Sequence, residues 1–127
     1  MQRKTLTLMD LEWRDGRTPI STEFDDVYFS TDEGLEETQY VFLKHNDLPD
    51  RWMGWDGSQF LIGELGFGTG LNFFATWQAW LDVQIQNPTQ KLANLHFWSC
   101  EKLPLDVQCI RKALSVWPRL SPLVEKF

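Results

Sequence analysis

The stretch that decides the fold reads Phe60-Leu-Ile-Gly-Glu-Leu-Gly-Phe-Gly-Thr-Gly-Leu-Asn-Phe-Phe74. An apolar run typical of a buried strand stops at Glu64, glycines follow at alternate positions, and an apolar stretch compatible with a helix begins directly after them. The pattern predicts a strand, a glycine turn and a helix. Gly66, Gly68 and Gly70 let a ligand approach the backbone, and the N–H groups that open the helix would face that ligand. A nucleotide-like molecule suits such a turn.

Spacing separates three nucleotide-binding motifs at this turn. A phosphate-binding P-loop requires Lys after its second glycine, but Thr69 follows Gly68, which excludes that motif. The dinucleotide fingerprint requires Gly or Ala three residues after its second glycine, where this chain has Leu71, which weakens that motif. The remaining pattern, acidic-x-Gly-x-Gly-x-Gly from Glu64 to Gly70, resembles the first motif of Rossmann-like S-adenosylmethionine methyltransferases. The alternative is a glycine-rich turn that holds no ligand.

The composition is that of one globular domain, or part of one. The 127 residues are 43% hydrophobic and include seven Trp, well above the content of a disordered segment. No apolar run approaches the ~18 residues of a membrane span, and Met1 to Trp13 lacks the apolar centre of a signal peptide, so we expect a cytoplasmic protein. Cys100 and Cys109 lie in stretches predicted to be buried and are expected to be reduced core thiols. No metal site is visible, because His45 and His96 lack ligand-spaced partners.

The net charge of -6 is unevenly spread along the chain. Between Thr18 and Leu43 there are seven acidic residues and no Lys or Arg, whereas Glu101 to Phe127 holds five basic residues and three acidic ones. Affinity for a nucleic-acid backbone comes from Lys and Arg that neutralise phosphates. A basic surface for RNA is therefore expected outside this sequence.

The first 58 residues predict a β-rich extension. Asp15-Gly16 is a strong hairpin signal between Leu6–Trp13 and Thr18–Ser21. Further along, Gln39–Leu43 reads as a strand, although Leu35–Tyr40 is also compatible with the start of a helix.

The segment from Asn46 to Ser58 reads as a loop, since it is rich in Asp, Gly and Pro. Its Trp52, Met53 and Trp55 are expected to cap the core. Both segments complete the predicted extension.

The helix after the glycine turn is expected from about Leu71 to Gln86, because Asn87 precedes a proline and is disfavoured in the α region. Helical spacing predicts one apolar face and one wetter face. The apolar face comprises Phe74, Trp77, Leu81 and Ile85, widened by Phe73 and Trp80, and the wetter face comprises Asn72, Thr76, Asp82 and Gln86.

A second buried strand is predicted at Leu95–Cys100, and it ends on Glu101. In a strand-helix-strand unit a ligand lies beyond the carboxyl ends of the strands, where Glu101 can accept hydrogen bonds from both hydroxyls of a ribose. The alternative is a solvated Glu that caps a helix. Pro104 fits the first turn of the next helix, and Ser121 fits the N-cap of another.

Several motifs taken together make the resemblance specific. They are Phe24-Asp-Asp-Val-Tyr-Phe-Ser30, Gly34-Leu-Glu-Glu-Thr-Gln-Tyr-Val-Phe-Leu43, Glu64-Leu-Gly-Phe-Gly-Thr-Gly-Leu-Asn-Phe73, Trp77-Gln-Ala79, Leu95-His-Phe97, Glu101-Lys102 and Pro104-Leu105. Over nearly the whole chain they look like the N-terminal methyltransferase domain of the bacterial bifunctional tRNA 5-methylaminomethyl-2-thiouridine biosynthesis family. The resemblance implies an S-adenosylmethionine-dependent enzyme that methylates the aminomethyl group of the wobble (thio)uridine in tRNA. It also implies a following FAD-dependent oxidoreductase domain, of which this sequence shows nothing.

The resemblance implies an α/β fold in two parts, a β-rich extension over residues 1–58 and the first strand-helix-strand-helix units of a Rossmann-like methyltransferase over 59–127. The sequence ends early relative to the methyltransferase domain that the resemblance implies. The later strands of that domain carry the catalytic carboxylate, so the catalytic residues are unknown. We expect the chain alone to be inactive, to bind tRNA poorly, and to associate nonspecifically or to be oligomeric. Two other hypotheses remain, a fragment of an NAD-dependent oxidoreductase and a noncatalytic truncated product. The residues carried over to the cofactor site are Glu64, Gly66, Phe67, Gly68, Gly70, Asn72 and Glu101.

Overall fold

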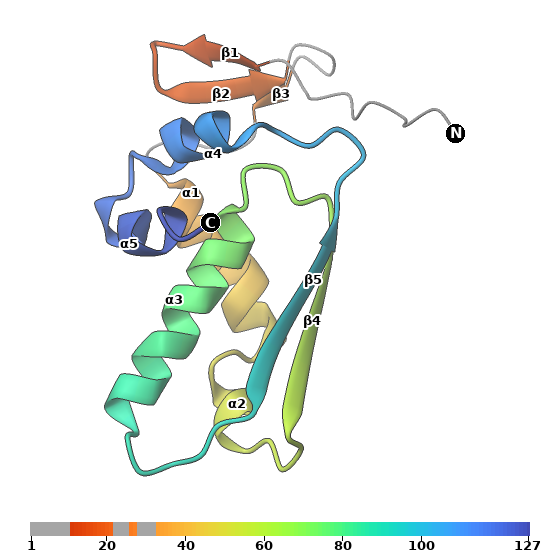
Figure 1. The fold of residues 1–127 in the computed structure, drawn as a ribbon, viewed down its shortest axis with the longest axis vertical. Coiled ribbons are helices and arrows are strands. Elements are labelled where there is room, and N and C mark those ends of the chain that lie inside the picture. The colour runs from red at the N-terminus through yellow and green to blue at the C-terminus, as the bar shows by residue number, and fades with distance from the viewer. Residues whose placement is uncertain (1–10, 22–25, 28–32) are drawn as a thin grey trace.

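The computed structural model describes residues 11–21, 26–27 and 33–127. At the N-terminal end, β1 (Leu11–Arg14), β2 (Thr18–Ser21) and β3 (Asp26–Val27) form an antiparallel sheet in that order (Figure 1). Asp15 and Gly16 have φ values of 52° and 69°, the left-handed region that an Asp-Gly turn favours. The hairpin prediction is confirmed for these residues, while the Leu6 to Asp10 part of it lies outside the described ranges.

Helical turns follow where a strand was expected. They are α1 (Gly34–Thr38), the π-helix η1 (Gln39–Leu43), the 3₁₀-helix η2 (Lys44–Asn46) and the single turn α2 (Asp50–Met53). The strand predicted at Gln39–Leu43 is therefore wrong, and the helical alternative is right. The loop predicted over Asn46–Ser58 needs the smaller correction that α2 lies within it.

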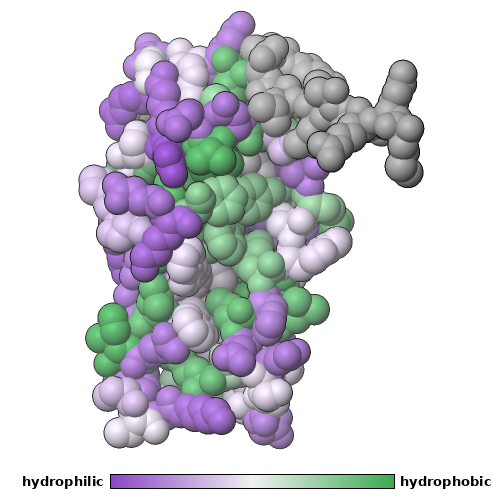
Figure 2. All heavy atoms as spheres, viewed as in Figure 1, coloured by the Kyte–Doolittle hydropathy of each residue, from purple (hydrophilic) through white to green (hydrophobic). Residues whose placement is uncertain are grey.

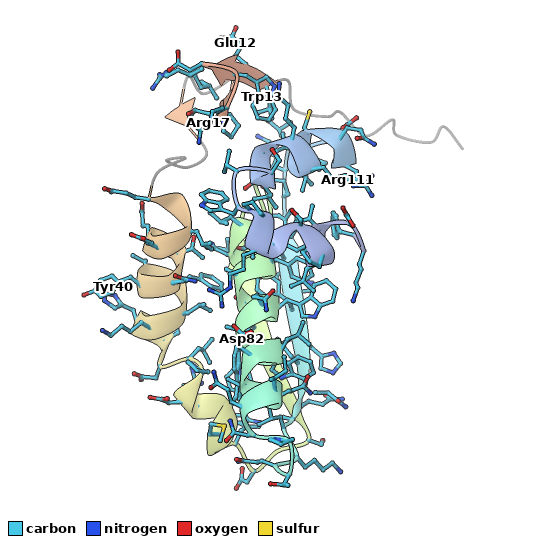
Figure 3. The ribbon with its side chains drawn as sticks, turned by 90° about the vertical axis from the view of Figure 1, so that its left-hand side faces the viewer. Glu12, Trp13, Arg17, Tyr40, Asp82 and Arg111 are labelled. Carbon is cyan, nitrogen blue, oxygen red and sulfur yellow. The ribbon has the colours of Figure 1, made fainter. Side chains whose placement is uncertain are left out.

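The cause of the error is that a short apolar run has no decisive periodicity. In the structure, helical spacing buries Thr38 and Leu43, and both α1 and η1 contact α3. Tyr40 and Val41 are more than half exposed, and Figure 3 shows Tyr40 pointing away from the rest of the molecule. Contact with a neighbouring helix, which the sequence does not display, decides the conformation of this segment.

The glycine turn connects β4 (Gln59–Leu65) to α3 (Leu71–Gln86), and β5 (Asn94–Cys100) follows. The two strands are parallel and pair in register from Gln59 opposite Asn94 to Leu65 opposite Cys100. The predicted strand, turn, helix and second strand are confirmed, as is the end of the helix at Asn87. Figure 1 shows α3 lying along one side of this pair, so the chain contains a strand-helix-strand unit of α/β type.

Each strand of this unit is buried on one face only. Phe60 and Ile62 of β4 and Leu95 of β5 belong to a cluster that α3 covers with Val83 and Trp80. Alternate residues point the other way, and on that face Leu61, Leu65 and Trp98 are 71%, 85% and 59% exposed. The expectation of two fully buried strands is therefore corrected to two half-buried ones.

Two residues of α3 differ from the face predicted for them, and Val83, which was assigned to neither face, is buried. Phe74 is fully buried, but Ile85, which was expected on the same face, is 76% exposed. Thr76, which was expected on the wetter face, is also fully buried, and its hydroxyl donates to the Asn72 carbonyl oxygen at 2.6 Å. That bond satisfies the hydroxyl within its own helix, so Thr76 can be buried without an unpaired polar atom.

The C-terminal part packs over the start of α3 and under the hairpin. It consists of α4 (Val107–Leu114), the 3₁₀-helix η3 (Pro118–Leu120) and α5 (Ser121–Val124). Its buried side chains form one cluster with α3, comprising Leu71, Phe74, Leu105, Ile110, Ala113, Leu114, Leu120, Leu123 and Val124. Trp13 of β1 lies over α4 (Figure 3), with the Lys112 ammonium 4.1 Å from the centre of its ring.

Two expected helix starts shift by a few residues. The Asp106 carboxylate accepts hydrogen bonds from the Gln108 and Cys109 amides, so α4 begins at Val107 rather than near Pro104. Ser121 is the first helical residue of α5 rather than its N-cap.

The cysteine expectation is half wrong. Cys109 is half-buried, but Cys100 is exposed because its position in β5 faces the open side of the sheet. Neither cysteine is in a disulfide. Among the helices of the described residues, none has the length and apolar content needed to cross a membrane.

Candidate functional site

The glycine turn between β4 and α3 is a tightly bent loop. Gly66, Gly68 and Gly70 have φ values of 84°, 58° and 80°, which residues with a Cβ atom rarely adopt. At Gly70 an added Cβ would lie 2.8 Å from the Phe67 ring, so space also requires glycine there. At Gly66 an added Cβ would have no neighbouring atom within 4 Å, so the backbone is open to a ligand on that side.

Backbone hydrogen bonds tie this loop to the end of β5. The amides of Gly66 and Phe67 both donate to the Cys100 carbonyl oxygen, at 2.8 and 3.2 Å, and the Gly70 amide donates to the Phe67 carbonyl oxygen. These loop amides are therefore engaged within the protein. Any ligand that binds beside the loop meets few free N–H donors from it.

Glu101 reaches the loop from the end of β5. One oxygen, Oε2, accepts a hydrogen bond from the Gly68 amide at 2.8 Å, and Oε1 accepts from the Leu103 amide at 3.3 Å. A carboxylate oxygen has more than one lone pair, so each can accept a further hydrogen bond. The structure thus brings together the two sequence features, the glycine turn and the acid after the second strand, that are 33 residues apart.

Glu64 lies behind the loop rather than beside an open space. It is 7% exposed, and both of its oxygens have partners, since Oε2 accepts from Asn72 Nδ2 and Oε1 accepts from Ser99 Oγ, each at 2.9 Å. The carboxylate therefore links β4, the first turn of α3 and β5. Glu64 and Asn72, both chosen from sequence as cofactor residues, are turned toward each other.

The environment of Glu64 gives the first testable prediction, a dependence of stability on pH. Burial raises the pKa of Glu64 above its ordinary value of 4.5, the negative charge of Glu101 adds to this effect, and the hydrogen bonds from Asn72 and Ser99 oppose it. Between pH 4.5 and the raised pKa, the folded protein holds more protons than the unfolded chain. The free energy of unfolding should therefore fall as the pH rises through this window and should level off above it.

Urea unfolding of the wild type and of Glu64→Gln over a range of pH measures this contribution. Because glutamine does not titrate, the wild type should lose stability relative to the variant as the pH rises through the same window. A difference between the two proteins that stays constant with pH would contradict the assignment of this pKa shift.

A hollow of about 350 Å³ of water-accessible space opens beside Glu101. It is lined by Phe67, Phe73, Phe97, Ser99, Glu101 and Phe127. Phe127 stacks on Phe67, with 5.9 Å between the ring centres. Figure 2 shows apolar side chains collected along the middle of the molecule on the face it displays. The hollow therefore has aromatic walls and two oxygen-bearing side chains.

Sequence reasoning missed the rings of Phe73, Phe97 and Phe127 in this hollow, and it missed one polar residue, Ser99. The available signal was its position two residues before Glu101, because alternate residues of a strand share a face. Of the residues chosen from sequence, Phe67 and Glu101 line the hollow, the three glycines shape the turn, and Glu64 with Asn72 supports it from behind. Among the described residues there is no group of three His, Cys, Asp or Glu side chains arranged to hold a metal.

Comparison with known proteins gives extensive similarity to part of one kind of protein. The chain matches no family model. It is 53% identical over 122 residues to the tRNA 5-methylaminomethyl-2-thiouridine biosynthesis bifunctional protein MnmC of Vibrio vulnificus. The matched region covers 96% of this chain and 18% of that protein. The proteins of the same name from Aliivibrio fischeri and Aeromonas hydrophila are 48% and 49% identical, over 99% and 100% of this chain. The chain spans about a fifth of the length of these curated relatives.

Proposed function

This chain belongs to the MnmC family as a segment of its proteins, and from that premise we propose that it is the cofactor-binding part of an S-adenosylmethionine-dependent tRNA methyltransferase. In this proposal residues 59–127 are the first part of a Rossmann-like domain, and residues 1–58 are an extension that packs on it. The methylated group is the aminomethyl group of the wobble (thio)uridine.

One observation carries the proposal, the bond between the Gly68 amide and the Glu101 carboxylate at the carboxyl ends of two parallel strands. Ligands of open α/β sheets bind in this place. The residues fit an adenosine-containing cofactor, because Glu101 can accept hydrogen bonds from ribose hydroxyls while Phe67, Phe97 and Phe73 offer aromatic surface to a base. The open side of Gly66 leaves room for the remainder of the cofactor.

The chemistry divides between cofactor and protein. S-adenosylmethionine supplies the methyl group bound to a positively charged sulfur. The work of this chain is to bind and orient, since transfer to an amine needs a neutral nitrogen held in line with that methyl group. A group that accepts the amine proton is also required, and we assign none to this chain.

The relatives' name refers to tRNA and to two functions, and the second function is proposed to lie outside this segment. There we place the FAD-dependent oxidoreductase activity and the Lys and Arg residues that hold tRNA. The acidic stretch from Thr18 to Leu43 gives phosphates nothing to bind. Such an enzyme would work in the cytoplasm, where tRNA is modified.

The second prediction separates this proposal from its alternative, an NAD-dependent oxidoreductase. Because the amides of Gly66, Phe67 and Gly68 already have partners within the protein, the loop offers little to a pyrophosphate. Calorimetry should show tighter binding of S-adenosylhomocysteine than of NAD. Two proteins should be titrated, the 127-residue chain and a chimera in which it replaces the matching segment of the Vibrio vulnificus relative.

A matched pair of glycine variants controls this experiment. Gly68→Ala places a side chain at positive φ, at a cost of roughly 1 to 2 kcal/mol, and should weaken binding of S-adenosylhomocysteine. Gly54→Ala, where an added Cβ meets no atom within 4 Å, should leave binding unchanged. Equal affinities for the two cofactors, or tighter binding of NAD, would overturn the methyltransferase proposal.

A further inference from the structure

Ser99 is placed to contact whatever binds in the aromatic hollow. It lines that hollow together with Glu101, and its hydroxyl oxygen also lies 2.9 Å from the buried Glu64 carboxylate. A serine hydroxyl has one proton and two lone pairs. The Ser99 hydroxyl donates its proton to Glu64 Oε1, so its lone pairs remain for the ligand.

We propose that Ser99 is a second hydrogen-bond acceptor for the ligand, beside Glu101, and that Glu64 is the positioning residue that holds it in this role. This inference rests on the proposed function and adds to it a means of selection. Two acceptors at one edge of an aromatic hollow favour a ligand with neutral donors, such as the hydroxyls of a ribose. They disfavour a phosphate at the same place, because a phosphate presents acceptor oxygens and negative charge to them.

The hydrogen bonds to the two oxygens of Glu64 fix the direction of the Ser99 hydroxyl. Asn72 occupies the second oxygen of Glu64 at 2.9 Å, which leaves Oε1 for Ser99. Since Glu64 is 7% exposed, water has little access to compete for that proton. The proton of Ser99 therefore stays directed at Glu64 and its lone pairs stay available to the ligand, whereas the hydroxyl of an exposed serine has no fixed direction.

The test compares how much affinity each protein loses when one ribose hydroxyl is removed from the ligand. The 127-residue chain and the chimera are titrated with S-adenosylhomocysteine and with its 2′-deoxy and 3′-deoxy analogues. In the wild type, the analogue that lacks the donor for Ser99 should bind roughly three- to tenfold more weakly than the parent compound. The ratio of the dissociation constants of analogue and parent compound should move toward one in Ser99→Ala for at least one analogue, since only bonds from Glu101 to that hydroxyl remain. Ser99→Thr, which keeps a hydroxyl, should restore the wild-type ratio.

One control variant and two separate outcomes make the result decisive. Ser115→Ala removes an exposed serine hydroxyl that bonds to Lys112 in α4 and should leave every ratio unchanged. A purely structural role of Ser99 would weaken all ligands equally, so unchanged ratios in Ser99→Ala would overturn the inference while the proposed function stands. If the wild-type proteins bind no S-adenosylhomocysteine, the proposed function fails first, and this inference fails with it.

Discussion

Replacing Glu101 with alanine is expected to weaken binding of S-adenosylhomocysteine by about 1.5 to 3 kcal/mol, roughly ten- to a hundredfold. The reason is that Glu101 is the carboxylate at the edge of the hollow, and hydrogen bonds to a charged group are the stronger kind. The variant also removes the acceptor of the Gly68 amide and so loosens the loop that the ligand would contact. Calorimetry on the chain and on the chimera measures the loss.

Two further substitutions show whether the loss belongs to this carboxylate. Glu125→Ala removes an exposed carboxylate after α5 that does not line the hollow, and it should bind as the wild type does. Glu101→Gln keeps one acceptor oxygen and should lie between the wild type and Glu101→Ala. If Glu101→Ala folds and binds with unchanged affinity, Glu101 is only a support for the loop, and the cofactor assignment of this residue is wrong.

The largest expected effect on stability comes from Phe74→Ala. Phe74 is fully buried in α3 within the cluster formed with α4 and α5, and it also contacts the rings of Phe73 and Phe127. Removing a buried phenylalanine side chain typically costs about 3 to 5 kcal/mol, because the surroundings collapse only partly into the space. Urea unfolding followed by circular dichroism should show a free energy of unfolding that is lower than that of the wild type by this amount.

Ile85→Ala is the matched control on the same helix. Sequence periodicity places Ile85 on the apolar face with Phe74, whereas the structure leaves it 76% exposed. Its truncation should change the free energy of unfolding by less than about 0.5 kcal/mol. A large loss in Ile85→Ala together with a small one in Phe74→Ala would show that the packing of α3 has been assigned to the wrong face.

Local patterns were sufficient to predict the central unit of the fold. The glycines after an apolar run indicated the turn between β4 and α3, the proline after Asn87 indicated the end of the helix, and Asp15-Gly16 indicated the hairpin. Each signal depends on backbone conformations that few residue types adopt, so it is readable without knowledge of neighbours.

The errors have a common cause, which is contact between distant segments. Gln39–Leu43 is helical because it packs on α3, and Cys100 is exposed because the outer face of β4 and β5 has no covering layer within the described residues. A strand sequence alone does not say whether one face or two will be covered. Helix starts shifted for a smaller reason, since the capping side chain of Asp106 decides where α4 begins.

The candidate site divides in the same way. Glu101 was placed correctly at the loop, because the carboxyl ends of adjacent parallel strands lie together whatever the rest of the chain does. The inward orientation of Glu64 was not predicted, because it depends on Asn72 and Ser99, which lie 8 and 35 residues away. Motif matching identifies the loop, and only the three-dimensional structure separates residues that line the hollow from residues that support it.

Transfer of a labelled methyl group tests the central claim most directly. The chimera and the isolated chain are each incubated with labelled S-adenosylmethionine and undermodified tRNA, and label in the tRNA is counted. We expect that the chimera labels tRNA, that Glu101→Ala in the chimera reduces this labelling at low cofactor concentration, and that the isolated chain transfers none. Labelling by the chimera that is insensitive to Glu101→Ala at every cofactor concentration would contradict the claim that this chain binds the cofactor.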